Sequence, residues 1–144
     1  GIRDRSVSRG LGDVYKRQEY MHNSKNKPII VIAEDNRDNY LLLEYVLKAD
    51  FQLLHAYNGR EAITLFKLYN PVILLMDIRM PEVNGYEALS EIRKISSNVP
   101  VIAVTAYAYS QDVKNILSYG FTDYIAKPIN VQTLKEKINN LLLK

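Results

Sequence analysis

Four short runs of apolar residues divide the chain, and a polar side chain follows each of them. The runs span residues 28–33, 72–76, 101–104 and 124–126. The second run contains no polar residue, and Met80 and Pro81 interrupt the chain soon after it. A run of this length between turn residues is typical of a strand buried on both faces of a parallel sheet. We therefore predict that the strand ending at Asp77 is central in the fold.

Apolar residues between these runs recur at helical spacing. The pattern predicts helices over residues 36–48, 61–69, 86–95, 110–119 and 130–142. It adds a fifth strand over 51–56 and extends the last apolar run to a strand over 121–126. The helix over 110–119 has the weakest pattern of the five, and Gly120 is a suitable residue to end it. Alternation of strands and helices predicts right-handed crossovers, a parallel sheet and helices on both of its faces, which is an α/β fold.

The apolar runs end in polar groups of different kinds. Glu34 and Asp35 follow the first run, Asp77 the second, and Thr105 and Lys127 the last two. The carboxyl ends of parallel strands meet at one edge of the sheet, where open α/β folds place their active sites. We therefore predict that these five side chains share one pocket. Taken singly, each has a simpler interpretation as a cap, a helix-start acid or a surface turn, but those interpretations leave the coincidence unexplained.

Three carboxylates in one pocket indicate a cation site. Glu34, Asp35 and Asp77 cannot all be ionised at close range unless a cation lies between them. Oxygen ligands suit magnesium, and the backbone carbonyl of Arg79 is a candidate for a further ligand. The sequence therefore predicts a Mg²⁺ site at the carboxyl edge.

A carboxylate beside a magnesium ion is suited to attack a phosphoryl group. Asp77 is the candidate nucleophile. The ammonium group of Lys127 would neutralise phosphoryl oxygens, and the hydroxyl of Thr105 would donate a hydrogen bond to one of them. Phosphoryl transfer depends mainly on such positioning and charge neutralisation.

Composition narrows the class of protein. The chain has 144 residues, 47% hydrophobic and 24% charged, which are ordinary values for one soluble globular domain, and no apolar segment is long enough to cross a bilayer. The absence of cysteine excludes disulfides, thiol catalysis and cysteine-based zinc sites, and it fits a cytoplasmic protein. The two histidines, His22 and His55, are too few for a histidine metal site, and we expect His55 to have a packing role on a strand.

The net charge of +3 lies in the first residues of the chain. Residues 1–18 contain five basic and two acidic side chains, and the remaining chain contains equal numbers of each. Its neutral body gives no reason to expect direct binding of nucleic acid.

Residues 1–26 lack a sustained apolar pattern, including the apolar segment of a signal peptide. Residues 8–18 resemble the translation of an adapter used in transposon-based sequencing libraries. We expect residues 1–26 to be an artefactual or disordered leader, with a short natural basic arm as the alternative, and residues 27–144 to form the domain.

The five candidate residues lie within longer sequence motifs that resemble those of one protein family. The motifs are Glu34-Asp35-Asn36, Met76-Asp77-Ile78-Arg79-Met80-Pro81, Asn84-Gly85, Thr105-Ala106 and Asp123-Tyr124-Ile125-Ala126-Lys127-Pro128. In this order and spacing they are similar to the receiver domain of two-component response regulators, over about residues 27–144. The resemblance implies a flavodoxin-like (βα)5 doubly wound parallel sheet with strand order 2-1-3-4-5.

The resemblance also implies a function. Asp77 would accept a phosphoryl group from a phosphohistidine on a histidine kinase or histidine phosphotransfer protein. Glu34 and Asp35 would hold Mg²⁺ together with Asp77 and the Arg79 carbonyl, and Lys127 would contact the phosphoryl group. Such a domain is a signalling switch in a phosphorelay, with weak self-phosphorylation and self-dephosphorylation, and not a conventional enzyme.

The resemblance extends to the switch itself. Tyr124 matches an aromatic residue that turns inward when Thr105 moves, and the responsive surface would comprise the fourth helix, fifth strand and fifth helix. A phosphorylation-dependent dimer is a further expectation. The Glu-Asp-Asn opening looks typical of receivers fused to sensor kinases, so we expect the C-terminal receiver of a hybrid sensor kinase or, as the alternative, a stand-alone receiver.

Two other classes of protein fit the sequence less well. A magnesium-dependent aspartyl-nucleophile phosphohydrolase usually has a second aspartate two places after the nucleophile, where this chain has Arg79. A flavodoxin-type nucleotide or flavin binder needs a phosphate loop after the first strand, where Glu34 and Asp35 would repel a phosphate.

Overall fold

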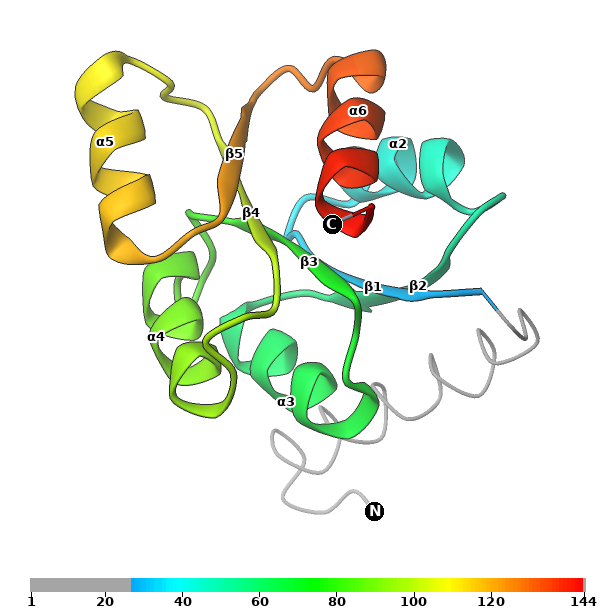
Figure 1. Cartoon of the computed structure of the whole chain (residues 1–144), viewed down its shortest axis with the longest axis horizontal. Coiled ribbons are helices and arrows are strands. Elements are labelled where there is room, and N and C mark those ends of the chain that lie inside the picture. Colours follow the sequence, from blue (N-terminus) through cyan, green and yellow to red (C-terminus); the bar gives the residue numbers. More distant parts are fainter. Residues whose placement is uncertain (1–26, 144) are drawn as a thin grey trace.

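Five strands and five helices alternate along residues 27–143, which are the residues that the computed structural model describes (Figure 1). In chain order they are β1 (Ile29–Ala33), α2 (Arg37–Leu47), β2 (Gln52–Ala56), α3 (Gly59–Tyr69), β3 (Ile73–Asp77), α4 (Gly85–Ile95), β4 (Val101–Thr105), α5 (Ser110–Tyr119), β5 (Asp123–Ala126) and α6 (Val131–Leu142). The predictions made for residues 1–26 lie outside this range. The predicted alternation is confirmed, with boundaries that shift by one or two residues.

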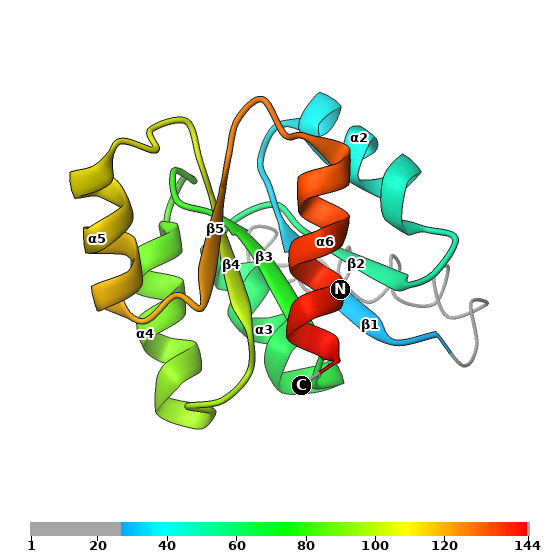
Figure 2. The same ribbon diagram turned by 45° about the horizontal axis from the view of Figure 1, so that its top comes forward.

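The strands form one parallel sheet in the order β2-β1-β3-β4-β5. The central strand, β3, pairs with β1 on one side and with β4 on the other. Helices α2 and α6 cover one face, and α3, α4 and α5 cover the other (Figures 1 and 2). The doubly wound fold and its strand order are therefore confirmed.

Two apolar cores, one on each face, hold the helices to the sheet. Along β3, Ile73 and Leu75 face α2 and α6, whereas Leu74 and Met76 face α3 and α4. All four side chains are at most 1% exposed. A strand covered on both faces needs consecutive apolar residues, which explains the uninterrupted run before Asp77.

An asparagine precedes four of the five helices. The side chains of Asn36, Asn58, Asn84 and Asn130 each accept a hydrogen bond from the backbone N–H three residues later. This satisfies a backbone donor that the first turn of a helix leaves unpaired. Helix α5 follows Tyr109 and has no side-chain cap, and Ile116 is its one buried residue. The weak apolar pattern of this segment in the sequence therefore corresponds to a helix with few buried side chains.

Gly85 closes the loop between β3 and α4. Its backbone N–H donates to the carbonyl oxygen of Ile78 at 2.9 Å. A Cβ atom at position 85 would lie 2.6 Å from the carbonyl oxygen of Asp77, which is too close for any side chain. Glycine is therefore required where α4 begins against the end of the central strand.

Arg93 ties the end of α4 to the amino ends of the last two strands. Its guanidinium group donates to the carbonyl oxygens of Val99 at 2.7 Å and Gly120 at 3.0 and 3.1 Å, and to Ser96 at 3.3 Å. Burial of this group lowers the pKa of Arg93 from its usual value. The contacts join three segments at the edge of the sheet opposite to the carboxyl ends.

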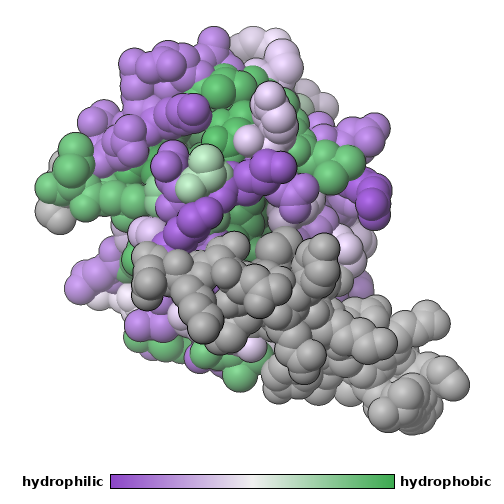
Figure 3. Space-filling model, turned by 90° about the vertical axis from the view of Figure 1, so that its right-hand side faces the viewer, coloured by the Kyte–Doolittle hydropathy of each residue, from purple (hydrophilic) through white to green (hydrophobic). Residues whose placement is uncertain are grey.

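The surface of the described residues mixes polar and apolar side chains. On the face shown in Figure 3, hydrophobic residues lie among hydrophilic ones. Larger apolar side chains are exposed on the outer side of α2, namely Leu41, Leu42 and Tyr45. Among residues 27–143 there is no helix with the length and apolar character that a membrane span requires.

Candidate functional site

The carboxyl ends of β1, β3, β4 and β5 enclose a cavity of about 450 Å³. The five residues predicted from the sequence all line it, namely Glu34, Asp35, Asp77, Thr105 and Lys127. Asp77 and Thr105 are the last residues of β3 and β4, and the other three lie one or two residues after β1 and β5. The parallel sheet therefore brings together side chains that are far apart in the sequence, since Glu34 and Lys127 are separated by 93 positions.

Three carboxylates in this cavity are arranged like the ligands of a cation. Glu34, Asp35 and Asp77 each offer an oxygen atom, and the three atoms lie within 4.8 Å of one another. Glu34 is 1% exposed and Asp77 is 4% exposed, whereas Asp35 is open to solvent. Two of the three charges are thus held away from bulk water.

Lys127 partly neutralises this cluster. Its Nζ atom lies 2.8 Å from Oδ2 of Asp77 and 3.5 Å from Oε1 of Glu34. Burial lowers the pKa of Lys127, but its hydrogen bond to Asp77 and the charges of Asp77 and Glu34 outweigh burial, so the pKa is raised overall. Lys127 is therefore an ammonium ion at neutral pH. One positive charge faces three carboxylates.

The pKa of Glu34 is shifted by its surroundings in the cavity. Burial and the charge of Asp77 raise its pKa to about 7, although the N–H of Asn36 donates to Oε2 at 3.2 Å. Oε1 is buried and accepts no hydrogen bond from the described residues, although the Lys127 ammonium lies 3.5 Å away. A buried carboxylate oxygen without a hydrogen bond can serve as a metal ligand. The donor set therefore fits Mg²⁺, which prefers oxygen ligands.

The raised pKa of Glu34 predicts an unusual dependence of stability on pH. Between pH 4.5 and pH 7 the folded, metal-free chain keeps a proton on Glu34 that the unfolded chain releases. The free energy of unfolding is therefore expected to fall as pH rises through this window, by about 3 kcal/mol in total, because each pKa unit corresponds to ~1.4 kcal/mol. Urea denaturation in EDTA between pH 4.5 and 8 measures this.

Glu34→Gln is the matched control, since its amide resembles the protonated acid. The difference in unfolding free energy between wild type and Glu34→Gln isolates the titration of Glu34 from that of other groups. A difference that stays constant across this pH range would contradict the raised pKa.

Both carboxylate oxygens of Asp77 accept a hydrogen bond. Oδ2 accepts from Lys127, and Oδ1 accepts the backbone N–H of Arg79 at 2.9 Å. These contacts fix the carboxylate at the end of β3. The carboxylate therefore has a defined orientation where it lines the cavity.

The hydroxyl of Thr105 is bonded away from the carboxylates. It donates to the carbonyl oxygen of Tyr107 and accepts the N–H of Tyr107, both at 3.0 Å. Thr105 lines the cavity, but its hydroxyl must leave the Tyr107 backbone before it can donate to a ligand.

Tyr124 does not line the cavity. Nζ of Lys137 lies 4.5 Å from the centroid of its ring, and Lys137 also pairs with Asp123 at 3.0 Å. The ring is partly buried against the core on the α3–α4–α5 face. The predicted switch role of Tyr124 is not tested by this arrangement.

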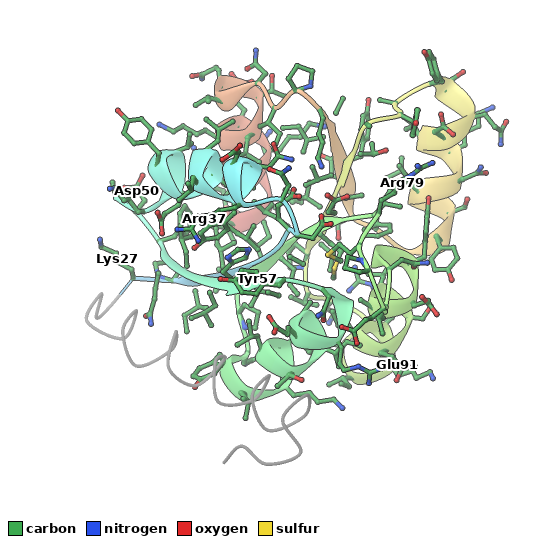
Figure 4. All side chains as sticks on the ribbon, turned by 180° about the vertical axis from the view of Figure 1, so that it is seen from behind. Lys27, Arg37, Asp50, Tyr57, Arg79 and Glu91 are labelled. Atoms are coloured by element: carbon green, nitrogen blue, oxygen red, sulfur yellow. The ribbon has the colours of Figure 1, made fainter. Side chains whose placement is uncertain are left out.

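The structure adds side-chain contacts that the sequence did not indicate, and two further lining residues, Tyr86 and Asp112. The guanidinium of Arg79, which is labelled in Figure 4, lies 4.9 Å from the centroid of the Tyr107 ring. Both residues line the cavity. Tyr86 and Asp112, from α4 and α5, also line it. Burial, followed by the charge of Asp112, raises the pKa of Tyr86. No spacing in the sequence pairs these side chains, because each contact depends on how two loops or two helices meet.

Comparison with known proteins identifies this arrangement. A family model described as "Response regulator receiver domain" matches residues 30–139. Hybrid signal transduction histidine kinase I of Dictyostelium discoideum is 39% identical over 125 residues, covering 80% of this chain and 7% of that protein. The polar-differentiation response regulator DivK of Brucella anthropi is 36% identical over 116 residues, covering 78% of this chain and 94% of that protein.

Solved structures give the same result. The receiver domain of a sensor histidine kinase from Pseudomonas aeruginosa, crystallised with a magnesium ion coordinated in its active site cleft, has a TM-score of 0.76 and 30% identity, covering 82% of this chain and 99% of that one. The receiver domain of Ssk1 from Saccharomyces cerevisiae, crystallised with the histidine phosphotransfer protein Ypd1, has a TM-score of 0.73 and 30% identity, covering 78% and 86%.

Proposed function

Since the chain belongs to the response regulator receiver domain family, we propose that its cavity transfers a phosphoryl group from a phosphohistidine to Asp77. The family works in two-component signalling. The observation that carries the proposal is the Asp77 carboxylate, which is 4% exposed and held by Lys127 beside two further acids. We take residues 27–144 as the receiver domain.

The residues of the cavity divide the work of the transfer. An oxygen of Asp77 attacks the phosphorus atom, the P–N bond breaks, and its electron pair stays with the imidazole nitrogen of the donor. The ammonium of Lys127, already 2.8 Å from Asp77, neutralises charge on the phosphoryl oxygens. Glu34, Asp35 and Asp77 would hold Mg²⁺, with the Arg79 carbonyl as a further ligand. When bound, the ion would supply further positive charge to neutralise those oxygens.

The partner proposed for this chain is a histidine kinase or a histidine phosphotransfer protein. The complex of Ssk1 with Ypd1 and the magnesium-bound kinase receiver support these choices, because both relatives share the fold at 30% identity. The chain spans 7% of the hybrid kinase, so the place of this domain in a longer protein stays a prediction. A cytoplasmic location, the absence of nucleic-acid binding and a phosphorylation-dependent dimer also stay predictions.

Thr105 and Tyr124 are proposed to carry the response. A bound phosphoryl group would compete with the Tyr107 backbone for the Thr105 hydroxyl. In the β4–β5 pair Tyr124 registers with Ala103, two residues before Thr105. The responsive surface would comprise α5, β5 and α6. Helix α5, with its uncapped start and single buried residue, is the least anchored of these elements.

Incubation with acetyl phosphate in the presence of Mg²⁺ or of EDTA tests the proposal. The chain is expected to gain the mass of one phosphoryl group with Mg²⁺ and none with EDTA. Hydroxylamine should remove the group, because it cleaves an acyl phosphate and leaves a phosphate ester intact. No gain from either acetyl phosphate or a phosphorylated histidine phosphotransfer protein would contradict the function, and continuous release of phosphate at high turnover would favour a phosphohydrolase.

A further inference from the structure

His55 is bonded to the loop that carries the acidic pair. It lies near the end of β2 and is 6% exposed. Its Nε2 atom is 2.8 Å from the carbonyl oxygen of Glu34. A carbonyl oxygen can only accept, so Nε2 carries the hydrogen and donates it. His55 therefore does more than the packing expected from the sequence.

The hydrogen bond between His55 and Glu34 lies one residue beyond the last paired residue of β1. The pairing of β1 with β2 ends where Ala33 meets Ala56, and the N–H of Glu34 donates to the carbonyl oxygen of Ala56 at 2.9 Å. The carbonyl of Glu34 then accepts from His55. Both backbone groups of Glu34 are thus bonded to β2, and Asp35 is the next residue along the chain. The direction in which the loop leaves the sheet is set by these two bonds.

Two tyrosines hold the imidazole ring in place. Tyr40 of α2 stacks on it with ring centroids 3.6 Å apart and an angle of 3° between the planes. Tyr57, labelled at the end of β2 in Figure 4, meets it edge-on with centroids 4.2 Å apart. These contacts on its face and edge restrict rotation of the ring that would carry Nε2 away from Glu34. The donor is therefore oriented before any ligand arrives.

We propose that His55 is a positioning residue for the magnesium site, which keeps Glu34 and Asp35 facing Asp77. The proposal rests on the proposed function, in which these three residues are the metal ligands. Repulsion among three carboxylates pushes the acidic loop away from β3 in the metal-free chain. The hydrogen bond to the Glu34 carbonyl opposes that displacement, so less rearrangement is needed when the cation binds.

Three variants separate the hydrogen bond from simple packing. His55→Phe keeps an aromatic ring between the two tyrosines and removes the donor. His55→Gln places an amide nitrogen near the position of Nε2 and keeps the donor. Leu53→Ala, on the same strand and in the core on the same face, weakens packing without touching the acidic loop.

Calorimetric titration with Mg²⁺ at pH 8, together with urea denaturation of each variant, tests the proposal. The affinity for Mg²⁺ is expected to be about tenfold lower in His55→Phe than in wild type. In His55→Gln it should return to within about threefold of wild type. Leu53→Ala should bind Mg²⁺ with wild-type affinity despite its lower stability. If His55→Phe does not fold, His55→Asn replaces it, since its shorter amide cannot reach the Glu34 carbonyl.

Each other outcome overturns the proposal. Wild-type affinity in the variant without the donor would remove the role of the hydrogen bond. Equal weakening in His55→Gln and His55→Phe, or weakening in Leu53→Ala, would assign the effect to packing. A wild-type chain that binds no Mg²⁺ would contradict the metal site of the proposed function as well, so the two failures are distinguishable.

Discussion

Asp77→Asn is expected to take up no phosphoryl group from acetyl phosphate under conditions in which the wild-type chain gains one. The amide is a far weaker nucleophile than the carboxylate, and no other carboxylate among residues 27–143 lies as close to the Lys127 ammonium. Asp35 is exposed, and Glu34 has a pKa of about 7 and so is partly protonated at neutral pH. Intact-mass measurement after incubation with Mg²⁺ and acetyl phosphate gives the result directly.

The substitution also removes a charge that faces Glu34. Because the charge of Asp77 helps to raise the pKa of Glu34, Asp77→Asn should lower that pKa and reduce the dependence of stability on pH. Asp123→Asn is the matched control, since Asp123 lies on β5 and pairs with Lys137. It should take up the phosphoryl group as wild type does. Wild-type uptake by Asp77→Asn would mean that another residue is the acceptor.

Lys127→Met is expected to slow phosphoryl uptake by about 100-fold, the typical cost of removing one oriented electrostatic group from a site of charge transfer. Methionine has a similar length but no charge. In the wild type, Nζ lies 2.8 Å from the attacking carboxylate, so the ammonium is in place before the phosphoryl group arrives. The initial rate of labelling at fixed Mg²⁺ and acetyl phosphate measures the change.

Mg²⁺ binding should survive the same substitution, because the ammonium competes with the cation for Asp77 and Glu34. Lys137→Met, which removes a second partly buried lysine outside the cavity, should label at the wild-type rate. A labelling rate for Lys127→Met within threefold of wild type would contradict the role of the charge. Loss of Mg²⁺ binding in this variant would show instead that the cavity had collapsed.

The sequence predicted the strands and the cavity for the same physical reason. An uninterrupted apolar run such as residues 73–76 has one stable position in a doubly wound sheet, buried on both faces, and its last residue then lies at the carboxyl edge. Asp77 and Thr105 follow directly from this rule. Glu34, Asp35 and Lys127 lie one or two residues past their strands, and the short loops kept them at the same edge.

The orientation of individual side chains could not be predicted in this way. The hydroxyl of Thr105 could face either the cavity or the following loop, and the structure has it bonded to Tyr107. The hydrogen bond from His55 to Glu34 joins residues 21 positions apart and depends on the stacking of Tyr40. Such contacts are decided by rotamers and by the approach of whole elements, which apolar periodicity does not encode.

The hydrogen bonds of Arg93 hold one end of α5 more firmly than the other. The carboxyl end of α5 is anchored, because the carbonyl of Gly120 accepts two hydrogen bonds from the Arg93 guanidinium. Its amino end has no side-chain cap and lies beside the Tyr107 loop at the cavity. The structure therefore holds α5 more firmly near Gly120 than near Ser110. If phosphorylation at Asp77 moves this helix, we expect the larger displacement at its amino end.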